Sequence, residues 1–191
     1  MADWTIGTGS NPYHFRSRSG AGTPQIRYFQ ESTAASTAVI KLGDIVSNDT
    51  VVSTGGFRIV RAPFNGGGGA NLLNTTNVLG VAVEASTSDG STTGLSNAQT
   101  RLIGVAVAAP DVEYLGYLVG TDNVSASSLI GLTRAVRYDS TNRIYAIDST
   151  NSTAALHSVV ITDIPDGTVG DTNGPVVFKF LSTGVSPAVR G

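Results

Sequence analysis

Short apolar runs separated by polar and glycine-rich gaps make up most of the chain after residue 38. Eight segments show this pattern: VIKLGDIVS, FRIVRAP, VLGVAVEAS, TRLIGVAVAAP, VEYLGYLVG, LTRAVRYDSTNRIYAID, ALHSVVITDI and PVVFKFLS. They are rich in Val, Ile and aromatic residues and are bounded by Gly, Asn, Asp and Ser, which is typical of antiparallel strands in a sandwich or barrel. No segment keeps a helical apolar stripe for the roughly 11 residues of an average helix. The pattern therefore predicts an all-β, mostly antiparallel barrel or sandwich with little helix.

One strand pattern occurs twice, as VLGVAVEAS at 78–86 and as LIGVAVAAP at 102–110. Aligned at Gly80 and Gly104, the two copies share Gly-Val-Ala-Val-x-Ala, and small alanines between valines suit strands that are covered on both faces. Two copies are too few for a solenoid, which needs about three. We predict that they pair, or take symmetry-related places, within one barrel. Glycine weakens a strand interior, so Gly80 and Gly104 are predicted to mark bulges or close backbone approaches.

Two hairpins can be read from the sequence. Residues 134–147 hold two alternating runs around the turn residues Asp-Ser-Thr-Asn, whose side chains can bond their own backbone. The later segment DIPDGTVGDTNG contains Asp-Gly and Asn-Gly turn signals, which predict a hairpin loop. Its Asp163, Asp166 and Asp171 offer oxygen ligands to calcium, but the spacing and terminal glutamate of an EF-hand loop are missing. Whether this loop binds an ion is left open.

The first residues differ from the rest of the chain. Five of the aromatic residues stand there among Gly, Ser and Pro, and the only charges between Asp3 and Glu31 are three arginines. One interpretation is a terminus whose aromatics fold back on the domain. The other is an arm that lies on a partner chain, because aromatic residues and arginine are enriched in interface cores. We predict an extended N-terminal arm at 1–35, a β-domain at 36–184 and a C-terminal tail at 185–191.

Composition and charge narrow the function classes. A chain of 191 residues can bury one sizeable core, and its net charge of −2 with no basic cluster argues against nucleic-acid binding. The absence of cysteine excludes disulfides and thiolate sites. We expect no membrane association and a product made in the cytoplasm, because no apolar run approaches the roughly 20 residues of a membrane span and no signal peptide is recognisable.

Candidate catalytic residues are few. The only histidines, His14 and His157, stand in no recognisable motif, and there is no G-x-S-x-G or phosphate-binding glycine loop. Asp111 and Glu113, two apart, would share one face of a strand as a glycosidase pair does, although such pairs also occur on ordinary wet faces. We expect no enzyme, no cofactor and no metal site, with a glycan hydrolase as the enzymatic alternative.

The order of the segments resembles the capsid decoration, or cement, proteins of tailed bacteriophages. The residues that carry this resemblance are Gly43-Asp44, Gly80-Val81-Ala82 and the Gly-Asp-Thr-x-Gly at 170–174. The resemblance covers roughly residues 38–181, and the order of the motifs carries it more than any one of them. It implies a compact β-barrel or β-tulip domain, often a homotrimer, that binds the outer surface of the phage head and grips the major capsid protein through a terminal extension.

The residues that would bind the capsid protein are inferred from the composition of the arm. Aromatic residues would serve as apolar anchors and arginines would meet an acidic capsid surface: Trp4, Tyr13, Phe15, Arg16, Arg18, Arg27, Tyr28 and Phe29. The resemblance therefore implies a structural virion protein, located on the outside of the capsid, that bridges major capsid protein subunits. The alternative is another phage structural module, such as a head-fibre base or a tail or receptor-binding β-domain.

Overall fold

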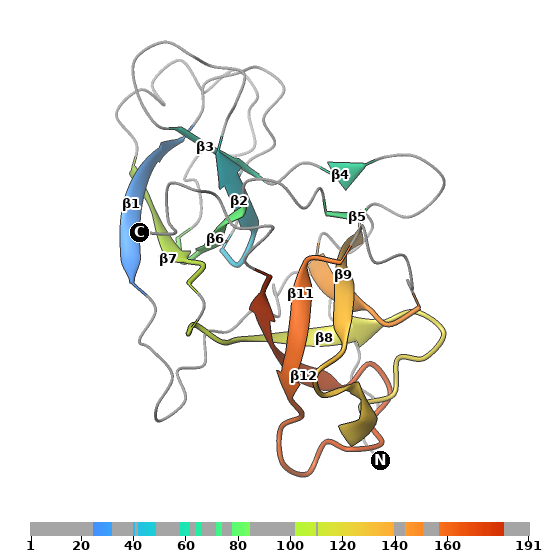
Figure 1. The fold of residues 1–191 in the computed structure, drawn as a ribbon. Coiled ribbons are helices and arrows are strands. Elements are labelled where there is room, and N and C mark those ends of the chain that lie inside the picture. The colour runs from blue at the N-terminus through green and yellow to red at the C-terminus, as the bar shows by residue number, and fades with distance from the viewer. Residues whose placement is uncertain are drawn as a thin grey trace.

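Two rings of strands lie side by side in the computed structural model of the chain (Figure 1). It describes residues 25–31, 40, 42–48, 58–61, 64–65, 72–73, 78–84, 102–109, 111–139, 144–150 and 157–181. The first ring is a closed barrel in the order β1-β3-β2-β6-β7. Its strands are β1 (Ile26–Glu31), β2 (Ile45–Asn48), β3 (Arg58–Arg61), β6 (Val78–Ala82) and β7 (Leu102–Val107).

The second ring has the order β10-β8-β12-β11-β9, and it closes because β10 also pairs with β9. Its strands are β8 (Tyr114–Val119), β9 (Thr133–Asp139), β10 (Ile144–Asp148), β11 (Val159–Asp163) and β12 (Pro175–Phe180). A short hairpin of β4 (Phe64–Asn65) and β5 (Leu72–Leu73) adds to β9. The only helical element of the described residues is the 3-10 turn η2 (Ser127–Leu129). The prediction of an all-β, mostly antiparallel fold with little helix is confirmed.

Each ring contains one parallel pair of strands. Strand direction cannot alternate all the way around a ring of five strands, so at least one neighbouring pair must run parallel. In the barrel this pair is β1 with β3, joined at Gln30↔Arg58 and Glu31↔Ile59. In the second ring it is β10 with β8, joined at Ile147↔Leu118 and Asp148↔Val119. We call each of these pairs the parallel seam of its ring. All other pairings within the two rings are antiparallel.

The repeated strands pair with each other, which is the first of the two predicted arrangements. β6 and β7 run antiparallel in the register Gly80↔Val107, Val81↔Ala106 and Ala82↔Val105. The Val83 N–H continues this register by donating to the Gly104 carbonyl at 2.9 Å. The valines of this shared stretch therefore each face an alanine or glycine of the other copy, so the stretch is complementary to itself. Both strands are buried on both faces except at Leu102.

Both predicted glycines lie at close approaches, and the closer one is at Gly80. The β2–β6 register passes from Val46↔Gly80 to Ser47↔Val78, so the bulge lies directly beside Gly80. A Cβ on Gly80 would lie 2.0 Å from the Ala106 carbonyl oxygen, which belongs to the backbone and cannot move aside. A Cβ on Gly104 would lie 3.0 Å from Cγ2 of Val83. The first glycine thus marks a bulge with a close backbone approach, and the second a close side-chain approach.

The two rings are filled differently but share one core. The barrel buries mainly valine, isoleucine and alanine, whereas the second ring buries Tyr114 and Phe178 with their rings stacked at 5.7 Å. The side chain of Phe180 packs edge-on against the aromatic rings of Tyr114 and Phe178, with centroid distances of 5.2 and 5.5 Å. The buried residues of both rings form a single hydrophobic cluster. Tyr114 belongs to it, and burial raises the pKa of its hydroxyl far above the ordinary value. That hydroxyl donates to the Ala106 carbonyl at 3.3 Å.

Both predicted hairpins are present. β9 and β10 pair antiparallel from Ile144↔Asp139 to Asp148↔Ala135, and the rings of Tyr138 and Tyr145 lie 5.2 Å apart across the pair. β11 and β12 form the later hairpin, with the aspartate-containing segment as its loop. These two hairpins and β8 make up the second ring.

Candidate partner-binding surface

Three of the eight predicted binding residues lie within the described part of the chain. Arg27, Tyr28 and Phe29 are consecutive residues of β1, so this piece of the predicted arm belongs to the barrel. The other five lie outside the described residues: Trp4, Tyr13, Phe15, Arg16 and Arg18. The domain boundaries predicted at 35 and 184 stay predictions.

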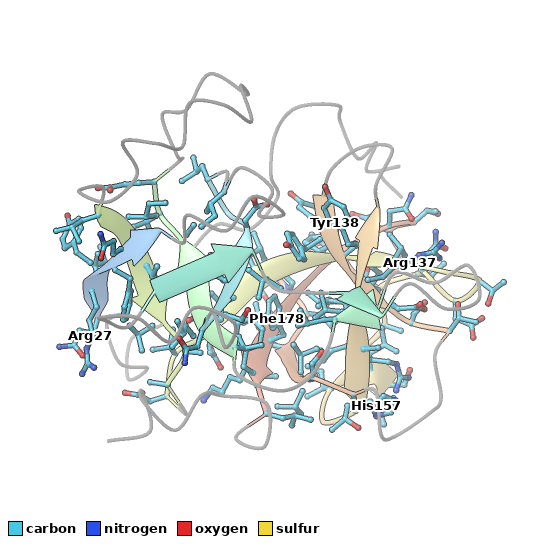
Figure 2. The ribbon with its side chains drawn as sticks, turned by 90° about the horizontal axis from the view of Figure 1, so that it is seen from above. Arg27, Arg137, Tyr138, His157 and Phe178 are labelled. Carbon is cyan, nitrogen blue, oxygen red and sulfur yellow. The ribbon has the colours of Figure 1, made fainter. Side chains whose placement is uncertain are left out.

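The pairing of β1 with β7 decides which way its side chains face. Residues directly opposite each other in an antiparallel pair share a face. Phe29 lies opposite Ile103 and Arg27 opposite Val105, so both belong to the face of β1 that is opposite to the face of Ile26 and Tyr28. Phe29 packs against the core, while Arg27 is exposed and points away from the body of the molecule (Figure 2). The structure therefore separates the predicted residues: Phe29 holds the barrel together, and Arg27 is available to a partner.

The outer face of the same strands carries an exposed apolar patch. Ile26 is 51% exposed and Tyr28 59%, and on β7 Leu102 is 57% exposed. Tyr28 lies opposite Gly104, and Leu102 is the next outward residue of β7. We call Ile26, Tyr28 and Leu102 the β1 surface. Sequence analysis found Tyr28 only. Leu102 was missed because it begins a run that reads as a fully buried strand, and Ile26 because it stands outside the aromatic set.

The first half of β1 also has a main-chain edge that pairs with no described residue. The Val107 N–H donates to the Gln25 carbonyl at 2.9 Å, so residues 25, 27 and 29 direct their main-chain groups toward β7. The main-chain groups of Ile26 and Tyr28 then point to the opposite edge. On that edge β3 pairs only with Gln30 and Glu31. Residues 25–28 are all exposed, which is unusual for a barrel strand and marks this half of β1 as an edge.

A second apolar surface lies at the lower end of the second ring in Figure 1, around η2 and the β11–β12 loop. Its exposed residues are Val124, Ile130, Leu132 and Val169. The two loops are joined by the isolated bridge Val124↔Thr172 and by two main-chain bonds of Ser125, whose N–H donates to the Asp171 carbonyl and whose carbonyl accepts from the Gly170 N–H. Segments 111–132 and 163–174 contain carboxylates but no Lys, Arg or His. This loop-end surface is therefore apolar with acidic residues around it.

The three aspartates of the β11–β12 loop are not gathered into one cluster. Among the described residues, no three carboxylate or histidine side chains lie close enough together to hold a metal ion. Asp171 is buried, whereas Asp166 is exposed. The loop is organised instead by the buried Ser125, whose hydroxyl donates to the Thr168 carbonyl and accepts from the Asp171 N–H at 3.2 Å. Asn173, with φ of 51°, makes the turn before Gly174. The hairpin-loop interpretation is confirmed.

The remaining candidates from the sequence are two carboxylates and two histidines. Asp111 and Glu113 both precede β8 and do not share a strand face as expected: Asp111 is exposed in a turn, and Glu113 is buried. A Glu113 carboxylate oxygen lies 3.9 Å from the Lys179 Nζ. His157 precedes β11, is half-buried, and its Nδ1 lies 2.7 Å from the Thr133 hydroxyl. His14 lies outside the described residues.

Comparison with known proteins gives no relative: the chain matches no family model, no curated protein and no solved structure. Within the described ranges, no helix is long and apolar enough to cross a membrane. The β1 surface, the open edge of β1 and the loop-end surface are therefore the features from which a function can be argued.

Proposed function

We propose that the chain is a structural virion protein, a capsid decoration protein that binds the outer surface of a tailed-phage head and bridges major capsid protein subunits. The observation that carries the proposal is the β1 surface, where Ile26 and Tyr28 stay exposed directly after the aromatic and basic residues 1–24. The order of motifs along residues 38–181 supports the same proposal. The partner is the major capsid protein, and the reaction is binding with no cofactor.

The physical basis is removal of apolar surface from water at two linked places. Burying an exposed leucine or isoleucine side chain contributes about 1.5–3 kcal/mol, which makes the β1 surface a useful but weak contact by itself. The arm would add its own aromatic contacts on the same or a neighbouring capsid subunit. Because the two contacts are covalently linked, the second forms at a high effective concentration and the combined affinity exceeds either alone.

We extend the proposal to a homotrimer on the head, as the resemblance implies. Light scattering of the free chain, followed by cross-linking on heads, measures the oligomeric state before and after binding. A monomer on heads would contradict the homotrimer and leave the decoration role to be tested separately.

The direct test of the decoration role uses heads that lack the protein. The full chain and a variant without residues 1–24 are titrated onto purified heads, and the bound fraction is measured by sedimentation. The truncation ends before β1, so it removes the arm and keeps every described strand. We expect the full chain to saturate the heads and the truncated chain to bind at least about tenfold more weakly, a difference of about 1.4 kcal/mol. Failure of the full chain to bind heads would overturn the proposal, and undiminished binding by the truncation would overturn the role of the arm.

Copy number separates decoration from the other phage structural roles. Quantitative mass spectrometry of purified virions gives the ratio of this chain to the major capsid protein. A ratio within a few-fold of one is expected for a protein that covers the head lattice. A handful of copies per particle would instead assign the chain to a head-fibre base, tail or receptor-binding position.

A further inference from the structure

We propose that the open edge of β1 accepts an extended segment of the capsid partner as an added strand, through main-chain hydrogen bonds at Ile26 and Tyr28. The inference rests on the proposed function, since it names the part of that function's partner that binds and the way in which it binds. Its basis is the geometry of the barrel's parallel seam.

The main-chain groups needed for strand addition are already in place. β7 uses the alternate residues of β1, beginning with the bond from the Val107 N–H to the Gln25 carbonyl, and so holds the strand extended. The N–H and C=O groups of Ile26 and Tyr28 consequently lie on the other edge, which within the described residues is paired only from Gln30 onward. A strand edge of this kind is the template that β-augmentation uses.

The side chains around the edge specify what the strand must carry. Ile26 and Tyr28 stand on the outer face at 51% and 59% exposure, so the partner residues beside them are expected to be apolar. Arg27 projects from the other face and is also exposed, and its side-chain bond within the described part of the chain is to the neutral Gln25 side chain at 2.9 Å. A carboxylate beside Arg27 would complete a charged pair. The partner segment is therefore an apolar-acidic-apolar strand.

Charge argues against a second copy of this chain as the occupant. Suppose that two copies pair antiparallel through their β1 edges and that each uses Ile26 and Tyr28. Ile26 of one copy then lies opposite Tyr28 of the other, and Arg27 lies at the centre of the pair. This register places the two Arg27 residues directly opposite each other, and like charges at that position destabilise a strand pair. A register that slides toward Gln30 competes with β3, which already pairs there. The capsid partner, rather than self-association, fits the edge.

Proline at position 28 tests main-chain pairing separately from the side chain. The Tyr28 N–H points away from β7, and proline is tolerated on a strand where its missing N–H would face solvent. Tyr28→Ala and Tyr28→Pro both lose the aromatic ring, but only Tyr28→Pro also loses the N–H. We expect Tyr28→Pro to bind heads at least about tenfold more weakly than Tyr28→Ala, because it also loses a main-chain hydrogen bond and meets a steric block.

The controls keep the two proposals distinguishable. Urea unfolding of both variants verifies that the barrel is intact, and if Tyr28→Pro is unfolded, Ile26→Pro against Ile26→Ala makes the same comparison at the next edge position. If the wild-type chain does not bind heads, the proposed function fails. If it binds and the proline and alanine variants bind equally, strand addition is overturned while the decoration role stands. A proline-sensitive dimer in the absence of heads would overturn the capsid partner as the occupant of this edge.

Discussion

The two rings solve the same closure problem in different ways. Each has five strands and must contain one parallel pair, and in the part of the chain that the structure describes each seam covers two residue pairs. Short parallel pairing is weak, because parallel strands are slightly less stable per residue than antiparallel ones. The seam is therefore the place where each ring is easiest to open. The contacts around the seam decide whether the ring stays closed there or leaves a strand edge exposed.

Hydrogen bonds beyond the strands reinforce the seam of the second ring. The Ser149 N–H and hydroxyl both donate to the Val119 carbonyl, at 2.9 and 2.8 Å. The Thr121 N–H donates to the Thr150 hydroxyl at 2.7 Å, and the Thr150 N–H donates to the Asp148 carboxylate at 2.9 Å. These bonds tie the ends of β8 and β10 together just past the last ladder pair. In the barrel, by contrast, the seam leaves the first half of β1 exposed.

The core side chains of the two rings differ in size, and this difference predicts that the rings respond in opposite ways to substitutions. The barrel closes around small residues and has backbone in contact with Gly80, so it has no room for added atoms. The second ring depends on large aromatic side chains such as Phe178, so it is damaged by removed atoms. A substitution that enlarges a residue should thus harm the barrel, and one that reduces a residue should harm the second ring.

The largest loss of stability is expected when a large side chain is removed from the core of the second ring. Phe178→Ala removes a fully buried ring that contacts Tyr114 and Phe180, and should lower the free energy of unfolding by about 4 kcal/mol in a urea titration. Phe178→Leu keeps much of the volume and should cost less than half as much. Equal losses for the two variants would contradict the filling argument.

The second largest loss of stability is expected when an atom is added inside the barrel. Gly80→Ala places a Cβ against the Ala106 carbonyl oxygen and should cost about 3 kcal/mol, because the obstacle is backbone. Gly131→Ala is the matched control: its φ is also positive, at 84°, but nothing lies within 4 Å of the added atom. It should cost about 1 kcal/mol, the strain of the backbone conformation alone. Similar costs at the two glycines would show that the β6–β7 contact is not tight.

A smaller effect is expected at the reinforced seam. Thr150→Val removes the acceptor of the Thr121 N–H and should cost about 1 kcal/mol, with faster hydrogen exchange at the Thr121 amide. Thr121→Val keeps that main-chain bond and loses only the contact between the two hydroxyls at 3.1 Å. It should therefore cost less. An unchanged Thr121 exchange rate in Thr150→Val would show that this bond does not hold the seam.

Almost no effect on stability is expected at the β1 surface. Tyr28→Ser and Leu102→Ser change exposed side chains and should alter the free energy of unfolding by no more than about 0.5 kcal/mol. Thermal unfolding measures this, with Phe29→Ser as the contrasting variant, because Phe29 packs against the core. A loss above about 1.5 kcal/mol for Tyr28→Ser would mean that this residue belongs to the fold rather than to a binding surface.

All eight predicted strand segments contain a strand, and the shared Gly-Val-Ala-Val restricted the repeat to two arrangements, pairing or symmetry-related places, of which the structure has pairing. β1 was not predicted, because Ile26-Arg27-Tyr28-Phe29 does not alternate between apolar and polar residues. This half of the strand is exposed on both faces, which removes the burial that creates such alternation. The closure of two rings was also beyond the sequence, since the pairings of β10 with β8 and of β1 with β3 join segments with no local signal for each other.

For the candidate site, the sequence supplied Tyr28 and Arg27 through the unusual aromatic and basic composition of the first residues. It could not separate Phe29, which faces the core, from its neighbours, because facing depends on the register with β7. Nor could it assign Leu102 to a surface. The exposure of that residue follows from its place at the start of β7, which the sequence presents as part of a continuous apolar run.

Residue-resolved hydrogen exchange of the free chain tests most directly whether β1 has an open edge. The account predicts slow exchange for the Arg27 and Phe29 amides, which face β7, and fast exchange for the Ile26 and Tyr28 amides, which face the open edge. The amides of Thr121 and Ser149 at the reinforced seam provide the internal comparison and should exchange more slowly than that of Tyr28. A Tyr28 amide as well protected as that of Arg27 would contradict the account, because the edge would then already be paired within the chain.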